Sequence, residues 1–412
     1  MKIIDRWLTG KLAKELTKPF VHILFGARQT GKTTLVNSLL PNPSLRYNLA
    51  DPEERTRLMA DPGLLRRECE ALPAGKRHYV VIDEAQLVPH VFDSVQAMYD
   101  TDKTRWIFAL CGSSARKMRK SGANLLPGRC ILHRLFPLTI EERPPMNFER
   151  FKNLLRIIPL PARRSGSTFP AADIEERMIY GELPGVVLLD EADRRSILRS
   201  FSAVHLEEEI RRESLVKDWG AFVNFLRLAA SEAGNTVNYS GISRETGLAV
   251  ATVKSHYQLL EDMFIGFHVP AYSKSPRKNL LSTPRFFFFD MGIRHAASGM
   301  VPDMNAVMAS PGRSFEQWAG IEIWKRLQYL DSGRLYHFRT KDGSEVDFVI
   351  ELPDRVIPVE VKWKVNPSLQ DVPGLVAFVR ENPRAETGYV VCRCPSPARL
   401  SDSIVAVPWQ CI

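Results

Sequence analysis

Short apolar runs alternate with amphipathic stretches along roughly the first third of the chain. The runs lie at 21–25, 45–49, 79–82, 106–111 and 130–135. Between them, apolar residues return at helical spacing. Buried strands that alternate with helices are typical of a parallel sheet with helices on both faces. We therefore predict an α/β fold for this part, with residues 1–20 as an amphipathic lead-in helix.

The hydrophobic pattern changes character several times after the sheet and divides the chain into five predicted segments. One of them, rich in Pro and Arg, indicates a linker or insertion. After it come a helical stretch, a helix–turn–helix with a hairpin pattern, and a second α/β unit. The predicted boundaries are 1–142, 143–172, 173–234, 235–300 and 301–412.

Composition narrows the class of protein only slightly. The 412 residues are 44% hydrophobic and 25% charged, as in an ordinary globular protein of two or three domains. The net charge of +9 favours an anionic partner such as nucleic acid, although a phosphate-bearing ligand accounts for part of it. Six scattered cysteines without zinc-site spacing indicate reduced residues. Without a long apolar run or a signal-peptide core, we expect a cytoplasmic protein with no membrane partner.

Residues 26–33 carry the most specific chemical signal, a complete G-x-x-x-x-G-K-[ST] phosphate-binding loop. It follows an apolar run and precedes a helical pattern at 34–40, so backbone N–H groups and the helix N-terminus would surround an anion. Lys32 is expected to reach the β- and γ-phosphates of ATP, and Thr33 to bind Mg²⁺. The residues predicted to bind the nucleotide are Gly26, Ala27, Arg28, Gln29, Thr30, Gly31, Lys32, Thr33 and Thr34.

Two further apolar runs end in polar residues suited to hydrolysis. One leads into Asp83 and Glu84, the Walker B arrangement, in which Asp83 would hold Mg²⁺ and Glu84 would polarise the attacking water. The next leads into Ser113 and Ser114, candidates for a sensor of the γ-phosphate. A plain turn is the alternative for either serine.

Arginine residues after the sensor strand offer the cation that a phosphoryl-transfer transition state requires. Arg129, in Pro-Gly-Arg, is placed where an arginine finger acting on a neighbouring subunit would lie, and Arg116 and Arg119 precede it. A solvated surface arginine is the alternative for Arg129.

Several motifs together resemble one family. They are Gly-Ala-Arg-Gln-Thr-Gly-Lys-Thr-Thr at 26–34, Ile-Asp-Glu-Ala-Gln at 82–86, Gly-Ser-Ser-Ala-Arg at 112–116, Leu-Leu-Pro-Gly-Arg at 125–129 and Phe-Pro-Leu-Thr-Ile-Glu-Glu at 136–142. The set is similar to the bacterial and archaeal AAA-type ATPases of the AAA+ superfamily that end in a nuclease-like domain of unknown function. The resemblance implies a P-loop ATPase domain at 1–142, a helical lid at 173–234, ATP and Mg²⁺ as cofactors, and a homo-oligomer. In this family the oligomer is usually a ring with active sites between subunits.

Residues 236–264 predict a helix, a tight turn at Gly247 and a second helix, the core of a winged-helix domain at 235–300. In a DNA-binding winged helix, the outer face of the second helix enters the major groove and the wing contacts phosphates. The residues expected to contact DNA are Thr252, Lys254, Ser255, His256 and Gln258 on the helix, and Lys274, Arg277, Lys278 and Arg285 on the wing. A lid or a protein contact is the alternative role.

The last segment, 301–412, places charged residues on a helix and two strands in a nuclease-like order. Glu316 lies on the helix, Asp347 begins one strand, and Glu360 and Lys362 lie two residues apart on the next, so they share a face. Asp followed by Glu-x-Lys is the PD-(D/E)xK pattern, in which carboxylates hold Mg²⁺ and the lysine helps to activate water. It resembles the core of archaeal junction resolvases and restriction endonucleases. The alternative is a fold without cleavage, in which these charges pair with one another.

Three functions are compatible with these patterns. The first is an ATP-hydrolysing oligomeric motor that binds and remodels DNA, with branched DNA such as a four-way (Holliday) junction as the first substrate to test. The second is an ATP-controlled, Mg²⁺-dependent endonuclease in repair or defence. The third is a signalling or protein-remodelling ATPase switch whose C-terminal domains bind proteins.

Overall fold

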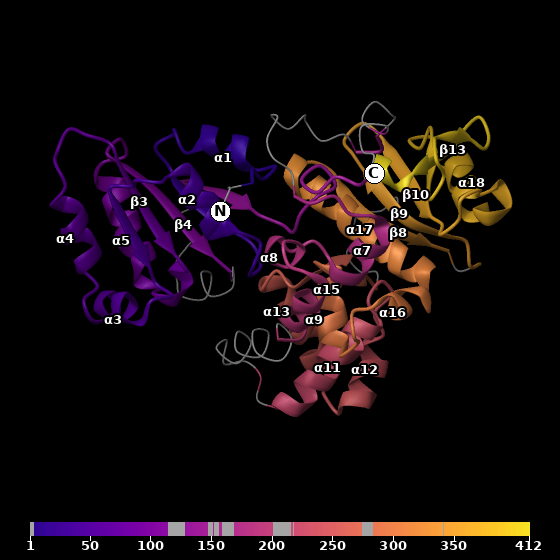
Figure 1. The fold of residues 1–412 in the computed structure, drawn as a ribbon, viewed down its shortest axis with the longest axis horizontal. Helices are drawn as coiled ribbons and strands as arrows, with labels where there is room; N and C mark the ends of the chain where they lie inside the picture. Colours follow the sequence, from indigo (N-terminus) through magenta and orange to yellow (C-terminus); the bar gives the residue numbers. More distant parts are fainter. Residues whose placement is uncertain are drawn as a thin grey trace. The chain divides into compact units, whose positions relative to one another are not determined.

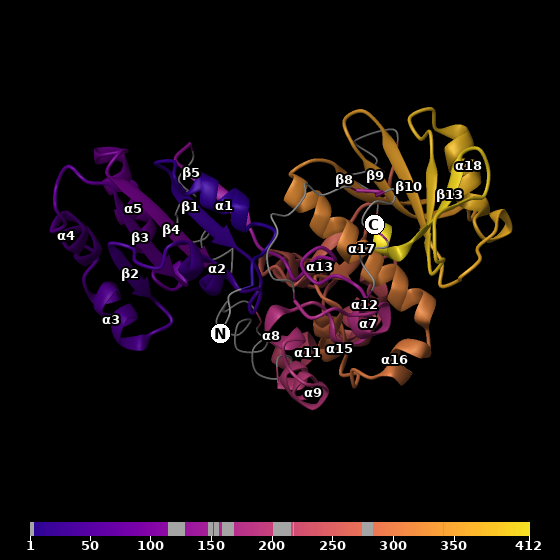
Figure 2. The same ribbon diagram turned by 45° about the horizontal axis from the view of Figure 1, so that its top comes forward.

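The computed structural model describes residues 4–113, 128–146, 151, 156–158, 169–200, 216, 218–273, 283–340 and 342–412. They form two compact units. The first ends at Pro137, and the second takes up the described residues from Leu138 onward except 262–264. In Figures 1 and 2 the first unit is drawn in indigo to purple, and the second runs from magenta to yellow.

The first unit is built on one parallel sheet. Its strands are β1 (Val21–Phe25), β2 (Leu45–Asn48), β3 (His78–Asp83), β4 (Trp106–Gly112) and β5 (Cys130–Arg134). All pairs are parallel, in the order β2-β3-β4-β1-β5. The central strands β1 and β4 are buried at every position, as in a sheet covered on both faces. The predicted parallel α/β sheet is confirmed.

Helices account for the burial of both faces of this sheet. They are α1 (Thr9–Glu15), α2 (Lys32–Leu39), α3 (Pro52–Ala60), α4 (Leu64–Glu70) and α5 (His90–Thr101), with a 3-10 turn at Ala85–Leu87. Val21 and Ile23 of β1 share a core with residues of α3, α4 and α5. Leu24, which points the other way, is buried as well, and α2 contacts both α1 and β4. Within the described residues 4–20 only α1 is helical, so the lead-in helix is shorter there than predicted.

The second unit begins with helices and a hairpin. The helices are α7 (Ile174–Tyr180), α8 (Pro184–Val187), α9 (Glu191–Ser200), α11 (Trp219–Ser231), α12 (Tyr239–Thr246), α13 (Val250–Asp262), α15 (Met291–Ser298) and α16 (Met304–Met308). Gly247 ends α12 with a φ of 71°, the left-handed conformation that glycine favours. An antiparallel pair, β6 (Gly266–Val269) and β7 (Arg285–Phe288), follows α13. The expected order of helix, turn, helix and hairpin is present, and its identity as a winged helix stays a prediction.

A mixed sheet completes the second unit. Its strands are β8 (Arg334–Arg339), β9 (Glu345–Glu351), β10 (Val356–Val361), β11 (Gly388–Cys392), β12 (Ala398–Arg399) and β13 (Ile404–Pro408), in the order β12-β13-β11-β10-β9-β8. β8, β9 and β10 are antiparallel, whereas β10, β11 and β13 are parallel. The accompanying helices are α17 (Pro311–Leu330) and α18 (Pro373–Glu381), with 3-10 turns at Leu369–Asp371 and Trp409–Cys411. Figure 2 shows the strands β8, β9 and β10 of this sheet beside α17.

The segment predicted as a linker, 143–172, is packed rather than free. Its described residues form no helix or strand. The buried ones include Arg143, Ile157, Ile158, Phe169 and Ala172. Arg143 is 0% exposed and pairs with Glu182 at 3.4 Å. These residues therefore contribute to the core of the second unit instead of forming a free linker, and the alternative of an insertion stays a prediction.

All six cysteines are free thiols rather than disulfides. In the described ranges, no helix is long and apolar enough to cross a bilayer.

A buried ionic network on α17 holds the segment with which the second unit begins. Glu322 is 1% exposed and accepts hydrogen bonds from the Ile140 N–H at 3.1 Å and from Arg326 at 3.0 Å. Lys325 donates to the Leu138 carbonyl and pairs with Glu322 at 2.8 Å. Burial by itself would raise the pKa of Glu322, but Lys325, Arg326 and the Ile140 N–H outweigh it and lower the pKa to about 2. The network is therefore charged at neutral pH.

Replacing Glu322 by Gln should destabilise the second unit. The variant leaves two buried cations without their carboxylate, and breaking a buried pair in this way costs about 3–5 kcal/mol. Thermal denaturation followed by circular dichroism should show a midpoint lowered by several degrees at neutral pH. Because the pKa is depressed, the stabilisation is present above the ordinary glutamate range and is lost as pH falls toward about 2.

Glu381→Gln is the matched control for this change. Glu381 forms an exposed ion pair with Arg380, and surface substitutions usually change stability by less than about 0.5 kcal/mol. Equal midpoints for the two variants would show that the buried network does not stabilise the fold.

Candidate nucleotide site and carboxylate cluster

The loop between β1 and α2 has the backbone geometry of an anion site. A Cβ atom at Gly26 would lie 2.4 Å from the backbone oxygen of Leu135, so only glycine fits there. Gly31 caps α2 with a φ of 91°, and Gln29 also has a positive φ of 62°. The loop therefore turns tightly at the carboxyl end of β1, with the N-terminus of α2 directly after it.

Lys32 and Thr30 are held inside this loop. The Lys32 ammonium donates to the carbonyls of Gly26 at 2.9 Å and Ala27 at 3.0 Å, and the residue is only 6% exposed. The Thr30 hydroxyl donates to the Ala27 carbonyl at 2.8 Å. The loop's own carbonyls thus satisfy the Lys32 cation, which lies among the backbone groups that would surround a phosphate.

Thr33 and Asp83 meet although fifty positions separate them in the sequence. The Thr33 hydroxyl donates to Asp83 Oδ2 at 2.6 Å. Thr33 belongs to the first turn of α2 and Asp83 ends β3, so both lie at the carboxyl edge of the sheet. Hydroxyl and carboxylate oxygens are the hard ligands that Mg²⁺ takes, with water and phosphate oxygens completing its shell. The pair fits the predicted Mg²⁺ site.

Glu84 lies beside Asp83 in a strained conformation. Its φ of 52° is unusual for a residue other than glycine, and its N–H donates to Asp83 Oδ1 at 3.0 Å. The Gln86 amide donates to Glu84 Oε2 and, at 3.2 Å, to Ser113 Oγ. Ser113 follows β4, which separates β3 from β1 in the sheet. The Ser113 hydroxyl also donates directly to Glu84 Oε2 at 3.4 Å, so Glu84 and Ser113 meet both directly and through Gln86.

Two residues that support this site were not predicted from the sequence. Gln86 stood out there only as the last residue of the motif at 82–86. The other is Arg6, which is 5% exposed and donates to the carbonyls of Thr30 and Phe136. A single arginine among the apolar residues of the lead-in segment was the available signal for it.

Among the residues predicted as arginine finger and sensor, the structure describes Arg129 and Ser113. Arg129 pairs with Asp100 of the same chain at 2.6 Å, with about a third of each side chain exposed. To act on another subunit it would have to leave Asp100, so its role stays a prediction. Ser114, Arg116 and Arg119 lie outside the described residues.

The nuclease-like residues also come together. Asp347 Oδ2 accepts a hydrogen bond from the Val361 N–H at 2.8 Å, and the Asp347 N–H lies 3.3 Å from Glu360 Oε2. Lys362 pairs with Glu360 at 2.7 Å. Glu316, on α17, is near enough to these residues for the charges of Asp347 and Glu360 to help raise its pKa. β9, β10 and α17 therefore supply one group of charges, as the spacing predicted.

Arg285, which was predicted to lie on the wing, pairs with carboxylates at this cluster. It is 5% exposed and pairs with Glu316 at 2.8 Å and with Glu345. The expectation that Arg285 contacts DNA phosphates is therefore wrong, because Arg285 is buried and Glu316 and Glu345 already hold it. The other wing residues, Lys274, Arg277 and Lys278, lie outside the described residues.

The carboxylates of this cluster are only partly neutralised. Burial, followed by the charge of Asp347, raises the pKa of Glu316 to about 8 and that of Glu360 to about 7. Burial also raises the pKa of Asp347. No three His, Cys, Asp or Glu side chains among the described residues form a ready metal cage. Mg²⁺ needs only one or two protein carboxylates, and the excess of negative potential fits such a cation.

The outer face of α13 matches the prediction except at one residue. Lys254, Ser255 and Gln258 are exposed. His256 is 6% exposed, and Phe222 and Phe225 pack against its ring.

The predicted role of His256 in binding DNA is wrong, because His256 follows Val253 by three positions and precedes Leu260 by four, on the buried side of the helix. Thr252 is half-buried.

Comparisons with known proteins bear on each segment separately. Residues 18–143 match the model of an AAA domain, whereas 171–303 and 311–412 match two domains of unknown function (DUF8612 and DUF4143). An uncharacterized protein of Haemophilus influenzae is 23% identical over 88% of this chain and 87% of its own length. One of Mycobacterium tuberculosis is 24% identical over 99% of this chain and 84% of its own length.

Two solved structures share low similarity with the chain. A DNA polymerase III gamma subunit-related protein of Thermotoga maritima is 12% identical, with a TM-score of 0.26 over 62% of this chain and 97% of its own. A signal transduction ATPase with numerous domains from Pyrococcus horikoshii is 14% identical, with a TM-score of 0.27 over 80% of this chain and 50% of its own. The match at 18–143 supports an AAA-type ATPase in this part of the chain, and the range contains the loop, Asp83 and Glu84.

Proposed function

We propose that this protein is an oligomeric, Mg²⁺-dependent ATPase that uses ATP hydrolysis to bind and remodel DNA. The observation that carries the ATPase part is the 2.6 Å contact between Thr33 and Asp83, directly beside Lys32. Two candidate metal ligands from different elements meet where the loop would hold the phosphates. The remaining groups of the site have roles that follow from their positions.

In this proposal, Lys32 exchanges the loop carbonyls for β- and γ-phosphate oxygens. Thr33 and Asp83 would hold Mg²⁺, which would neutralise charge on the phosphates. Glu84 orients and polarises the attacking water, and Gln86 fixes the Glu84 carboxylate. Ser113 Oγ accepts a hydrogen bond from the Gln86 amide. Ser113 directly follows β4, where we expect a γ-phosphate sensor.

DNA binding is proposed from the charge of the chain and from the exposed face of α13. The chain carries a net charge of +9, and α13 exposes Lys254 and Gln258. Oligomerisation rests on the family resemblance and on Arg129 as the residue that would reach a neighbouring site. Branched DNA such as a four-way junction is the first substrate to test.

An ATP-controlled endonuclease is the second candidate function. The observation in its favour is the group of Asp347, Glu360, Lys362 and Glu316, in which two carboxyl groups have pKa values raised to about 7 and 8. Asp347 and Glu360 would hold Mg²⁺, and Lys362 would stabilise charge near the scissile phosphate.

Lys32→Ala should lower ATP hydrolysis at least about a hundredfold, because the transition-state charge loses its cation. Glu84→Gln should keep nucleotide binding and lower turnover by about 10²–10⁴-fold, because the amide cannot act as a base. Phosphate release and binding of a fluorescent ATP analogue measure the two effects separately.

Lys76→Ala is the matched control, since Lys76 is an exposed lysine of the same unit. The proposed ATPase roles fail if Lys32→Ala and Lys76→Ala hydrolyse ATP equally fast.

DNA should stimulate ATP hydrolysis, most strongly when it is branched. The measurement compares turnover with linear, forked and four-way DNA over a range of salt, because phosphate contacts make the stimulation fall steeply as salt rises. If no DNA form changes the turnover, the protein does not act as a DNA motor.

Mg²⁺ should stabilise the second unit more at about pH 9 than at about pH 6. The raised pKa values of Glu316 and Glu360 mean that stability is lost as pH rises through about 7 to 8, where these two carboxyl groups ionise. A cation offsets that loss only when they are ionised. Thermal midpoints with and without Mg²⁺ measure the effect.

Asp347→Asn should remove most of this Mg²⁺ effect and any Mg²⁺-dependent cleavage of DNA. The exposed Asp354, changed to Asn, is the matched control. A Mg²⁺ shift that is the same at both pH values and in both variants argues against a cation in this cluster.

A further inference from the structure

A cavity of about 1230 Å³ lies within the second unit, lined by α13, the β6–β7 hairpin, α17 and the edge strand β8. Its volume exceeds the range of about 300–1,000 Å³ that is usual for small-molecule pockets. A smaller cavity of about 470 Å³ shares Arg334, Glu351 and Arg384 with it. The hollow therefore continues beside β8, and the two volumes together leave room for a segment of a chain-like ligand.

Aromatic rings form much of the wall. Those that line the cavity are Tyr239, Tyr272, Trp324 and Tyr336. Trp324 stacks on Phe267 with ring centroids 4.0 Å apart and planes 3° apart, and Tyr272 packs edge-on against Tyr336. Neighbouring rings hold these side chains in place, and ordered aromatic faces are the platforms on which bases of single strands stack.

The charged groups of the cavity favour an anion. Lys254, Arg334 and Arg384 are its lysine and arginines, and Glu351 is its acidic residue. Glu351 pairs with Arg384 at 3.2 Å, whereas Lys254 lies 5.3 Å from the Tyr239 ring centroid. In the described part of the chain, neither Lys254 nor Arg334 pairs with a carboxylate. Two positive charges are thus left facing the hollow.

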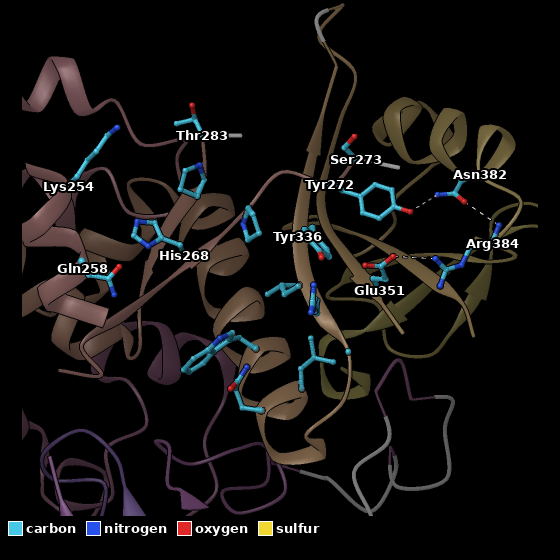
Figure 3. A pocket seen from close by; sticks show the side chains of 18 of the residues that line it. Lys254, Gln258, His268, Tyr272, Ser273, Thr283, Tyr336, Glu351, Asn382 and Arg384 are labelled. Atoms are coloured by element: carbon cyan, nitrogen blue, oxygen red, sulfur yellow. Dashed lines mark hydrogen bonds and ion pairs between the residues drawn. The ribbon is translucent and has the colours of Figure 1, made fainter. Parts of the chain in front are cut away.

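Amide groups complete the lining. Gln258, Gln328 and Asn382 can each donate and accept hydrogen bonds, as the edges of bases require. Figure 3 shows Lys254 and Gln258 extending from α13 on one side, with Tyr272, Asn382 and Arg384 on the other.

The edge of β8 disfavours a peptide that adds to the sheet. The Tyr272 N–H donates to the His337 carbonyl at 2.6 Å, and the His337 N–H donates to the Pro270 carbonyl at 3.0 Å. The chain itself therefore covers this edge at His337, and only 334–336 remain beside the cavity. Three residues are too few for β-strand addition, so recognition has to come from side chains.

We propose that this cavity binds a single-stranded segment of DNA. Its bases would stack on the aromatic wall, and its phosphates would lie against Lys254 and Arg334. The inference rests on the proposed DNA-directed function and adds the place and the form of the ligand. It also changes the role of α13, because Lys254 and Gln258 serve a hollow shared with the C-terminal sheet instead of a duplex major groove.

Fluorescence anisotropy with the full-length protein and a labelled oligo-dT of about ten nucleotides tests this inference. The wild type should bind the single strand more tightly than a duplex of equal length. Lys254→Glu combined with Arg334→Glu should weaken binding about tenfold or more. The slope of log Kd against log salt should fall by roughly 0.7 for each phosphate that the variant no longer neutralises.

Arg244→Glu combined with Arg399→Glu is the matched control. Both residues are exposed. Arg244 lies on α12, and Arg399 lies on β12, at the edge of the C-terminal sheet opposite β8. The change in net charge is the same as in the cavity variant, because each double variant replaces two cations by two glutamates. This control should bind oligo-dT within about twofold of the wild type, because it keeps the cationic side chains of the cavity.

Trp324 provides a second, spectroscopic readout. Oligo-dT should quench part of the intrinsic fluorescence in the wild type. Trp324→Phe should lose that part of the quenching and still bind, because phenylalanine keeps a ring for stacking.

Several outcomes would overturn the inference. If the two double variants weaken binding equally, binding depends on the overall charge of the protein and not on the cavity. If a labelled polyglutamate peptide binds as tightly as oligo-dT, the cavity is a site for acidic peptides. If the wild type binds only duplex or branched DNA, or if the cavity variants leave single-strand binding unchanged, this inference fails while the DNA-directed function stands. If the wild type binds no DNA at all, both fail.

Discussion

At Gly26 the phosphate-binding loop approaches the backbone of Leu135 so closely that no side chain fits between them. This close approach joins the loop after β1 to the chain leaving β5, and Arg6 bridges the same two segments through the carbonyls of Thr30 and Phe136. With the loop held at the carboxyl edge of the sheet, Thr33 reaches Asp83. The geometry of the candidate nucleotide site therefore depends on main-chain packing between neighbouring parallel strands.

The second unit contains two buried groups of charges that differ in compensation. Around Glu322, two cations and a backbone N–H outweigh burial, and the pKa falls to about 2. Around Asp347, the carboxylates outnumber their partners, and burial with mutual repulsion raises the pKa of Glu316 to about 8. The first arrangement is typical of a structural network. In the second, the carboxylates repel one another, and a bound cation would relieve that repulsion. Perturbed groups of this kind are often found at functional sites.

Much of the first unit could be predicted because its signals are local. The run at 106–111 is apolar throughout and the run at 21–25 is apolar except for His22, which identifies strands buried on both faces. The loop spacing identifies an anion site. The errors concern side chains whose surroundings come from distant segments. His256 packs on two phenylalanines of α11, Arg285 pairs with carboxylates of α17 and β9, and Arg143 is buried against α7 and Glu182. A charged or polar residue looks exposed in a sequence when its partner lies far along the chain.

The sequence by itself identified the candidates for chemistry in this protein: the loop with Lys32 and Thr33, Asp83 and Glu84 at the end of β3, and Asp347 with Glu360 and Lys362. Spacing along a strand or across one turn carries that information, because it depends on neighbouring residues alone. Only the tertiary structure decided which of these groups meet, that Gln86 and Arg6 support them, and that α13 and β8 line one cavity. Such contacts depend on how sheets and helices pack, and residues fifty or more positions apart carry no local pattern that reveals them.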